Sequence, residues 1–263
     1  MIPNTPSDPQ KVHVTVHGHV VSYTDVGTGP VVVAIHGLPG DASDFRWLGT
    51  VLEPHVRFIR LELPGFGHSA PESGSLKWPD PPRFVADTLK ALSLNNVTLM
   101  GHSYGTGVAL CTAVANPERV KRLVLLAPFG QQPHRGIRQF PVPSLVQLVL
   151  GIPIIRQPLI HMARASLKKS GFRKPIADEH IVRTMDAIAT WRFNEYATAV
   201  STLQCPVFGA YCLDDHLIEA PLMDGLLKAC PEGPRMVFET GGHNLQKTHA
   251  VEVGAAIVDW LSP

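Results

Sequence analysis

The sequence predicts an α/β domain in which a mostly parallel β-sheet carries helices on both faces. Short continuous apolar runs recur along the chain, and such runs are typical of strands that are covered on both sides. Segments with helical periodicity alternate with these runs, which indicates successive βαβ units. The 263 residues, 44% of them hydrophobic, are enough for one large buried core.

The predicted elements follow one another from the N-terminus. Residues 12–16 and 20–26 alternate between apolar and polar side chains around His17-Gly18-His19, which predicts a β-hairpin. The continuous apolar runs predict strands at residues 31–35, 56–61, 97–100, 122–127, 206–211 and 236–239. Helical patterns separate them, at residues 43–52, 83–92, 104–115, 222–229 and 250–261.

The alternation fails between Phe129 and Thr202, where prolines and helical patterns occur without a convincing strand. About 70 residues are too many for a connecting loop, so this region is expected to have structure of its own. We predict a short helix at residues 144–150 and a longer one at residues 180–199. The predicted organisation is a core formed by residues 1–128 and 203–263, with a helical lid inserted at residues 129–202.

Composition and charge exclude several classes of partner. The 23 Lys and Arg residues balance 22 Asp and Glu residues, which gives no electrostatic reason to expect nucleic acid. Residues 1–10 lack the basic and apolar regions of a signal peptide, and the apolar stretch at 141–162 is too interrupted for a membrane span. We therefore expect a cytoplasmic protein with a small-molecule substrate and no integral membrane segment. The sequence does not predict its oligomeric state.

The four cysteines are Cys111, Cys205, Cys212 and Cys230. They form no C-x-x-C pair and have no histidine at zinc-finger spacing, so no metal site is predicted. Free thiols, buried or half-buried in a reducing compartment, are the favoured interpretation, and a Cys205–Cys230 disulfide is the alternative.

A candidate nucleophile lies in Gly101-His102-Ser103-Tyr104-Gly105, which fits the pattern G-x-S-x-G. The pattern indicates a catalytic serine here because an apolar strand precedes it and a helical segment follows it. On so sharp a strand-to-helix turn, Ser103 is held in an exposed position, and glycines are needed on both sides because a Cβ would collide with backbone. His102 is interpreted as structural because its side chain points elsewhere.

A serine hydroxyl needs a general base within hydrogen-bonding reach. Among 13 histidines, His243 is the candidate because it follows Gly241-Gly242 directly after a predicted strand. That position lies at the carboxyl edge of the sheet, the same edge as Ser103.

The acid that orients this histidine should also follow a strand, between the serine and the histidine in chain order. Asp214 and Asp215 both follow the run at residues 206–211. Asp215 is favoured because Leu217-Ile218 after it would pack onto the core. Asp214 would then be a solvated loop carboxylate or a cap of the next helix.

An oxyanion hole is expected from His36-Gly37-Leu38-Pro39-Gly40, which follows a predicted strand. Acyl transfer places negative charge on the former carbonyl oxygen, and two backbone N–H donors stabilise it. The expected donors are the N–H groups of Leu38 and of Tyr104, the residue after the nucleophile.

Taken together, these motifs resemble the α/β-hydrolase superfamily over roughly residues 12–261, and Leu63-Pro64-Gly65-Phe66-Gly67 adds to the match. The resemblance implies an eight-stranded sheet, a helical lid over the site, and neither metal nor organic cofactor. The H-G-x-P loop and the segment from Gly241 to His249 look like epoxide hydrolases and haloalkane dehalogenases. Those enzymes use an aspartate nucleophile, whereas this chain has Ser103. Many relatives also carry Asp at the position of Glu62.

Serine at this position favours acyl transfer through an ester intermediate. The expected function is therefore that of a serine hydrolase that cleaves a carboxylic ester of a small to medium hydrophobic substrate. Cleavage of a carbon–carbon bond, a lactone or an amide by the same three residues is the alternative. A ligand receptor that keeps the fold without turnover is a third interpretation, of a different class.

The inserted region contains many large apolar side chains, some of which are expected to line a pocket over Ser103. The candidates for substrate contact are Phe129, Leu145, Trp191 and Phe193. A basic run without intervening acids also lies there, formed by Arg164, Lys168, Lys169, Arg173 and Lys174. A solvated helix face explains this run, and attraction to an anionic substrate or lipid surface is the alternative.

Overall fold

The computed structural model of the protein describes residues 6–77, 79–138, 152–169 and 175–262. An eight-stranded sheet forms its centre, in the order β1-β2-β4-β3-β5-β6-β7-β8. The strands are β1 (Val12–Val16), β2 (His19–Val26), β3 (Val31–Ile35), β4 (Arg57–Leu61), β5 (Val97–His102), β6 (Val120–Leu126), β7 (Val207–Cys212) and β8 (Arg235–Phe238).

Strand direction divides the sheet into two parts. The hairpin β1–β2 joins β4 in antiparallel pairing, with Tyr23 opposite Leu61. From β4 through β3 and on to β8, every pair is parallel. The predicted mostly parallel eight-stranded sheet is therefore confirmed, and the ends of six strands meet at one edge.

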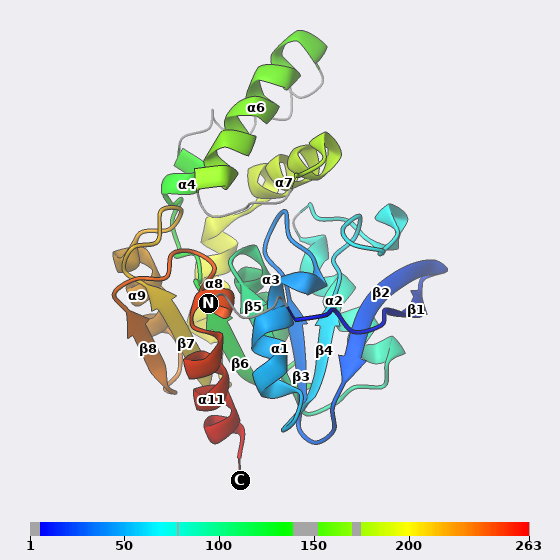
Figure 1. The fold of residues 1–263 in the computed structure, drawn as a ribbon, viewed down its shortest axis with the longest axis vertical. Coiled ribbons are helices and arrows are strands. Elements are labelled where there is room, and N and C mark those ends of the chain that lie inside the picture. The colour runs from blue at the N-terminus through cyan, green and yellow to red at the C-terminus, as the bar shows by residue number, and fades with distance from the viewer. Residues whose placement is uncertain (1–5, 78, 139–151, 170–174, 263) are drawn as a thin grey trace.

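Helices flank the sheet on both faces (Figure 1). Helices α1 and α11 pack against each other on one face, and α2, α3 and α8 pack side by side on the other. The bounds are η1 (Ala42–Phe45), α1 (Arg46–Leu52), η2 (Pro71–Ser73), α2 (Asp80–Ala91), α3 (Tyr104–Ala115), α9 (Ala220–Ala229), α10 (Leu245–Thr248) and α11 (Ala250–Leu261).

Between β6 and β7 the described residues form helices and no strand. These helices are α4 (Arg135–Arg138), α6 (Pro153–Lys169), α7 (Asp178–Thr190) and α8 (Phe193–Thr202). Figure 1 shows α4, α6 and α7 beyond one end of the strands, above the edge where the connecting loops gather. The helix expected at residues 144–150 lies outside the described residues.

The single helix predicted for residues 180–199 is wrong, because the structure breaks it between α7 and α8. Trp191 ends α7 in an extended conformation with φ −63° and ψ 132°. Its indole is buried against Tyr104, Phe129 and Tyr196, with ring centroids 5.0–5.5 Å apart. Burial of so large an aromatic ring favours the bend over an unbroken helix, and helical periodicity alone does not reveal it.

One hydrophobic cluster unites the sheet with its flanking helices, and it includes Tyr196 and Val200 of α8. A second, smaller cluster joins α6 to α7 through Ile160, Ile181 and Met185. All four cysteines are free, three of them buried, so the prediction of free thiols is confirmed.

The turn between β5 and α3 gives a prediction about stability. A Cβ on Gly105 would lie 2.2 Å from the carbonyl oxygen of Ile35. We expect Gly105→Ala to lower the free energy of unfolding by about 3 kcal/mol, because the strand backbone has to move. Gly225 in α9 is the matched control, since no atom lies within 4 Å of its added Cβ.

Gly225→Ala should be neutral or should stabilise by up to about 1 kcal/mol, through helix propensity. Urea denaturation of both variants checks the pair. Equal unfolding midpoints for the two variants would contradict the close contact at Gly105.

Candidate active site

Ser103 lies on the sharp turn between β5 and α3. Its backbone has φ 51° and ψ −121°, a conformation that costs a non-glycine residue about 1–3 kcal/mol. A Cβ on Gly101 would come within 2.4 Å of the Gly105 carbonyl oxygen, so the turn needs glycine there. The turn presents Ser103 to the wall of a pocket.

Asp215 and His243 come from separate loops and form a buried side-chain pair. Nδ1 of His243 lies 2.7 Å from Oδ2 of Asp215, and each residue is 4% exposed. The other carboxylate oxygen, Oδ1, accepts the N–H groups of Leu217 at 2.7 Å and Ile218 at 3.0 Å. Because a carboxylate only accepts, the imidazole donates from Nδ1, and its Nε2 is left free to take a proton.

Two opposing effects act on the pKa of Asp215. Burial alone would raise it, since a carboxylate loses its hydration. The His243 ring and the N–H groups of Ile218 and Leu217 outweigh burial, and the pKa lies below the ordinary value. Asp215 is therefore ionised at neutral pH.

His102 connects the serine turn to the histidine loop. Its Nε2 donates to the carbonyl oxygen of His243 at 2.9 Å, and the two rings lie 5.0 Å apart. Burial, together with the nearby His243, lowers the pKa of His102 to about 3. Such a ring is a weak base whose Nε2 is already engaged. His102 therefore holds His243 beside the strand end that carries Ser103.

Asp214 is an exposed loop carboxylate, which is one of the two positions expected for it. It does not cap α9, whose N-cap residue is Glu219. Instead, its exposed carboxylate accepts the N–H groups of Gly241 at 3.2 Å and Gly242 at 2.8 Å. Asp214 thus holds the loop before His243, while its neighbour Asp215 holds the imidazole.

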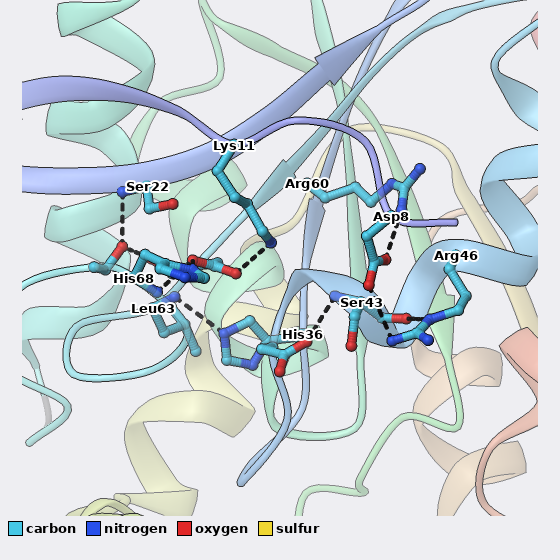
Figure 2. Close-up of polar contacts among 12 residues, drawn as sticks. Asp8, Lys11, Ser22, His36, Ser43, Arg46, Arg60, Leu63 and His68 are labelled. Carbon is cyan, nitrogen blue, oxygen red and sulfur yellow. Dashed lines mark hydrogen bonds and ion pairs between the residues drawn. The ribbon is translucent and has the colours of Figure 1, made fainter. Parts of the chain in front are cut away.

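The loop His36–Gly40 lies against the serine turn. A Cβ on Gly37 would lie 3.0 Å from Cβ of Ser103, so the two segments are in close contact. Nε2 of the buried His36 accepts the N–H of Leu63 at 3.0 Å (Figure 2). Its Nδ1 donates to the Gly37 carbonyl at 2.8 Å. These bonds fix the loop to the segment after β4.

The two expected N–H donors belong to residues that line the same pocket as Ser103. Tyr104 is the first residue of α3, so its N–H has no acceptor within the helix. Leu38 follows Gly37 and lines the same pocket as Ser103 and Tyr104. The peptide bond between Leu38 and Pro39 is cis.

Glu62 is buried at the start of the 63–68 loop, at 1% exposure. It pairs with the ammonium group of Lys11 and accepts the N–H of His68 at 2.7 Å (Figure 2). Burial would raise the pKa of Glu62, but these partners lower it overall. Glu62 therefore holds the N-terminal segment and the 63–68 loop together, away from the pocket.

The pocket beside Ser103 is almost entirely apolar. Of the four predicted substrate contacts, Phe129, Trp191 and Phe193 line it, and Leu145 lies outside the described residues. Helices α6 and α7 cover it with side chains that include Leu167, Ile181, Met185 and Ile188. His134, which is not among the predicted contacts, also lines the pocket. Nothing in the local pattern distinguishes it from the other histidines of the inserted region.

The basic run of the inserted region is only partly described. Arg164 forms an ion pair with Asp178 at the start of α7 and also approaches the Ile176 carbonyl. Lys168 is exposed on α6. Arg164 therefore has a structural partner, and neither residue lines the pocket.

Within the described part of the chain, no helix is long and apolar enough to cross a membrane. The same residues contain no group of three or more histidine, cysteine or carboxylate side chains placed to hold a metal ion.

Comparison with known proteins agrees with this architecture. Residues 30–149 match the family described as alpha/beta hydrolase fold. A 2-hydroxy-6-oxononadienedioate/2-hydroxy-6-oxononatrienedioate hydrolase of Dechloromonas aromatica is 25% identical over 91% of this chain and 90% of its own. A pimeloyl-[acyl-carrier protein] methyl ester esterase of Aliivibrio fischeri is 25% identical over 82% of this chain and 88% of its own.

A crystal structure of a haloalkane dehalogenase loop variant from Bradyrhizobium elkanii superposes with a TM-score of 0.78. It is 16% identical, and the match covers 96% of each chain. The chain has the α/β-hydrolase fold, and the two relatives named above are a hydrolase and an esterase. It is accordingly an enzyme of the hydrolase class.

Proposed function

We propose that this enzyme cleaves carboxylic esters by nucleophilic catalysis, with Ser103 as nucleophile, His243 as general base and Asp215 as the acid that orients the base. The observation that carries the proposal is the buried 2.7 Å bond between His243 and Asp215, next to a strained serine turn that opens into a pocket. A serine in such surroundings is activated, whereas a solvated serine is a poor nucleophile.

The proposed reaction has two halves. Nε2 of His243 takes the proton of the Ser103 hydroxyl as the oxygen attacks the ester carbonyl, and the resulting imidazolium is stabilised by Asp215. The imidazolium then gives that proton to the leaving alcohol, which frees an acyl-enzyme. Water, deprotonated by the same imidazole, attacks the acyl group and releases the carboxylic acid.

The oxyanion of each tetrahedral intermediate is assigned to the N–H groups of Leu38 and Tyr104. The start of α3 adds a favourable dipole, because a helix N-terminus attracts negative charge. Removal of one such donor typically costs about 3–4 kcal/mol in the barrier.

The helices between β6 and β7 are assigned as a lid over the site. Their pocket-facing side chains are mainly apolar, and the described lining contains no Lys, Arg, Asp or Glu. The D. aromatica relative is named for a dioate, and a dianion in this pocket would have no described cationic partner. The pocket therefore favours an uncharged ester with a small to medium hydrophobic part.

Labelling with a fluorophosphonate tests the proposal without a known substrate. We expect stoichiometric modification of Ser103, located by mass spectrometry of the 101–105 region, because only an activated serine reacts quickly. His243→Ala should slow the labelling at least about a hundredfold, since it removes the base.

A folded protein that takes up no label at Ser103 would overturn the proposal and favour a receptor without turnover. Once labelling is established, hydrolysis of esters, lactones, amides and carbon–carbon bonds distinguishes the reaction types that the same three residues can perform.

A further inference from the structure

We infer that His134 is a specificity-determining residue that accepts a hydrogen bond from a hydroxyl or N–H group on an otherwise apolar, uncharged substrate. The inference rests on the proposed function, since it concerns the pocket that Ser103 lines. It follows from the orientation of the ring, its charge state, and the chemistry of the wall around it.

The orientation of the His134 ring is fixed by one carbonyl group. Nδ1 of His134 lies 3.0 Å from the carbonyl oxygen of Leu217. A carbonyl only accepts, so Nδ1 carries the hydrogen, and in a neutral ring Nε2 then has a free lone pair. The N–H of Gly136 donates to the same carbonyl at 2.9 Å, which ties both ends of this turn to one atom.

The His134 ring is neutral at physiological pH. Burial lowers its pKa to about 4, although the bond to Leu217 opposes the shift. Nε2 is therefore an acceptor and not a donor near neutrality. Within the described residues, no side chain or backbone group donates a hydrogen bond to it.

The pocket that His134 lines has no charged side chain among its described residues. Phe129 lies beside the ring, at 6.4 Å between centroids. Thr184 uses its hydroxyl hydrogen on the His180 carbonyl at 2.8 Å, so its oxygen can only accept from a substrate. An acceptor in an apolar wall pairs with a donor and repels a carboxylate, because two lone pairs cannot share a hydrogen.

His134 also has a fixed place relative to the proposed catalytic residues. The N–H of Leu217 donates to Oδ1 of Asp215, and the carbonyl of Leu217 accepts from His134. One residue thus links the acid that orients His243 to the acceptor in the pocket. His134 therefore accepts from a substrate donor that lies at a set distance from the reacting carbonyl.

Isosteric ester pairs test this role. Methyl alkanoates and alkyl acetates of increasing chain length are each compared with the analogue in which a hydroxyl replaces the terminal methyl group. For the pair whose hydroxyl reaches His134, we expect His134→Phe to lower the preference for the hydroxyl member about tenfold in kcat/KM. His134→Gln, whose amide oxygen still accepts, should keep most of the preference. His134→Leu gives a second apolar variant if the phenylalanine disturbs folding.

Ile188→Val is the matched control, because it changes the shape of the pocket wall but removes no hydrogen-bond acceptor. It should alter both members of each pair by the same factor. The inference is overturned if His134→Phe and His134→Leu each change kcat/KM by the same factor for both members of every pair. That result would leave the hydrolase proposal intact.

Calorimetric binding to Ser103→Ala protein separates the two proposals, since that variant cannot turn the esters over. Discrimination by His134 in binding, with no hydrolysis by the unaltered protein, would refute the proposed function and support the role of His134.

Discussion

Ser103→Ala is expected to lower kcat for short p-nitrophenyl esters by about 10⁴- to 10⁶-fold, with little change in KM. The hydroxyl oxygen forms the only covalent bond between enzyme and substrate in the proposed reaction. Without this oxygen, the pocket and the N–H groups of Leu38 and Tyr104 still bind the ester, but no acyl-enzyme can form. Steady-state kinetics of the variant and of the unaltered protein measures the fall in kcat.

The fold should survive this substitution. Alanine keeps the strained φ of 51° and removes only one oxygen, so the free energy of unfolding should change by less than about 1 kcal/mol. Ser201, exposed on α8, is a matched serine whose replacement by alanine should leave kcat unchanged. Ser103→Ala protein that retained a tenth of the original kcat would remove Ser103 from the mechanism.

The parts of the site that the sequence predicts are those with a local steric requirement. Gly101 and Gly105 are needed because a Cβ at either position would overlap backbone within 2.4 Å. Likewise, Gly241 and Gly242 precede His243 with φ of 135° and 67°, and both amides face one carboxylate. Such requirements leave glycine in fixed places, and glycine next to an apolar run is visible in the sequence.

The parts that the sequence leaves open depend on side chains from distant segments. Asp214 and Asp215 are adjacent and chemically identical, and only the approach of the β8–α10 loop gives each its own partner. His134 lines the pocket, and its ring is held by the Leu217 carbonyl, 83 positions away. No local pattern encodes such a contact.

The same distinction explains the helix that the sequence places incorrectly. The helical periodicity of α7 continues through Trp191 into α8, so residues 180–199 read as one segment. The bend arises because the indole packs between Tyr104 and Phe129, which belong to the core. Tertiary packing outweighs local propensity there, and the result places Trp191 and Phe193 on the pocket wall.

Asp215→Asn is expected to lower kcat about 10⁴-fold, a loss close to that from removing the nucleophile. The amide that replaces the carboxylate presents an N–H group toward Nδ1 of His243. The imidazole then accepts at Nδ1 and carries its hydrogen on Nε2, the wrong tautomer for a base. Kinetics with the same p-nitrophenyl esters measures the loss, and a fall of less than about tenfold would show that Asp215 does not orient the base.

Asp214→Asn is the matched control one residue earlier. Among the described residues, its carboxylate accepts the N–H groups of Gly241 and Gly242 alone, and its side chain is exposed. An asparagine oxygen can still accept from one of them, so kcat should fall by at most about tenfold. A larger fall in kcat for Asp214→Asn than for Asp215→Asn would mean that Asp214, and not Asp215, orients the base.

The pH dependence of stability gives an independent check on Asp215. Its folded pKa lies below the ordinary value of 3.8, so the ionised carboxylate stabilises the fold above that value. This contribution is lost as the pH falls through the folded pKa, when the carboxylate takes up a proton. The free energy of unfolding of the unaltered protein should therefore fall more steeply with acid than that of Asp215→Asn. Parallel curves for the two proteins would mean that the buried bond to His243 does not hold Asp215 ionised.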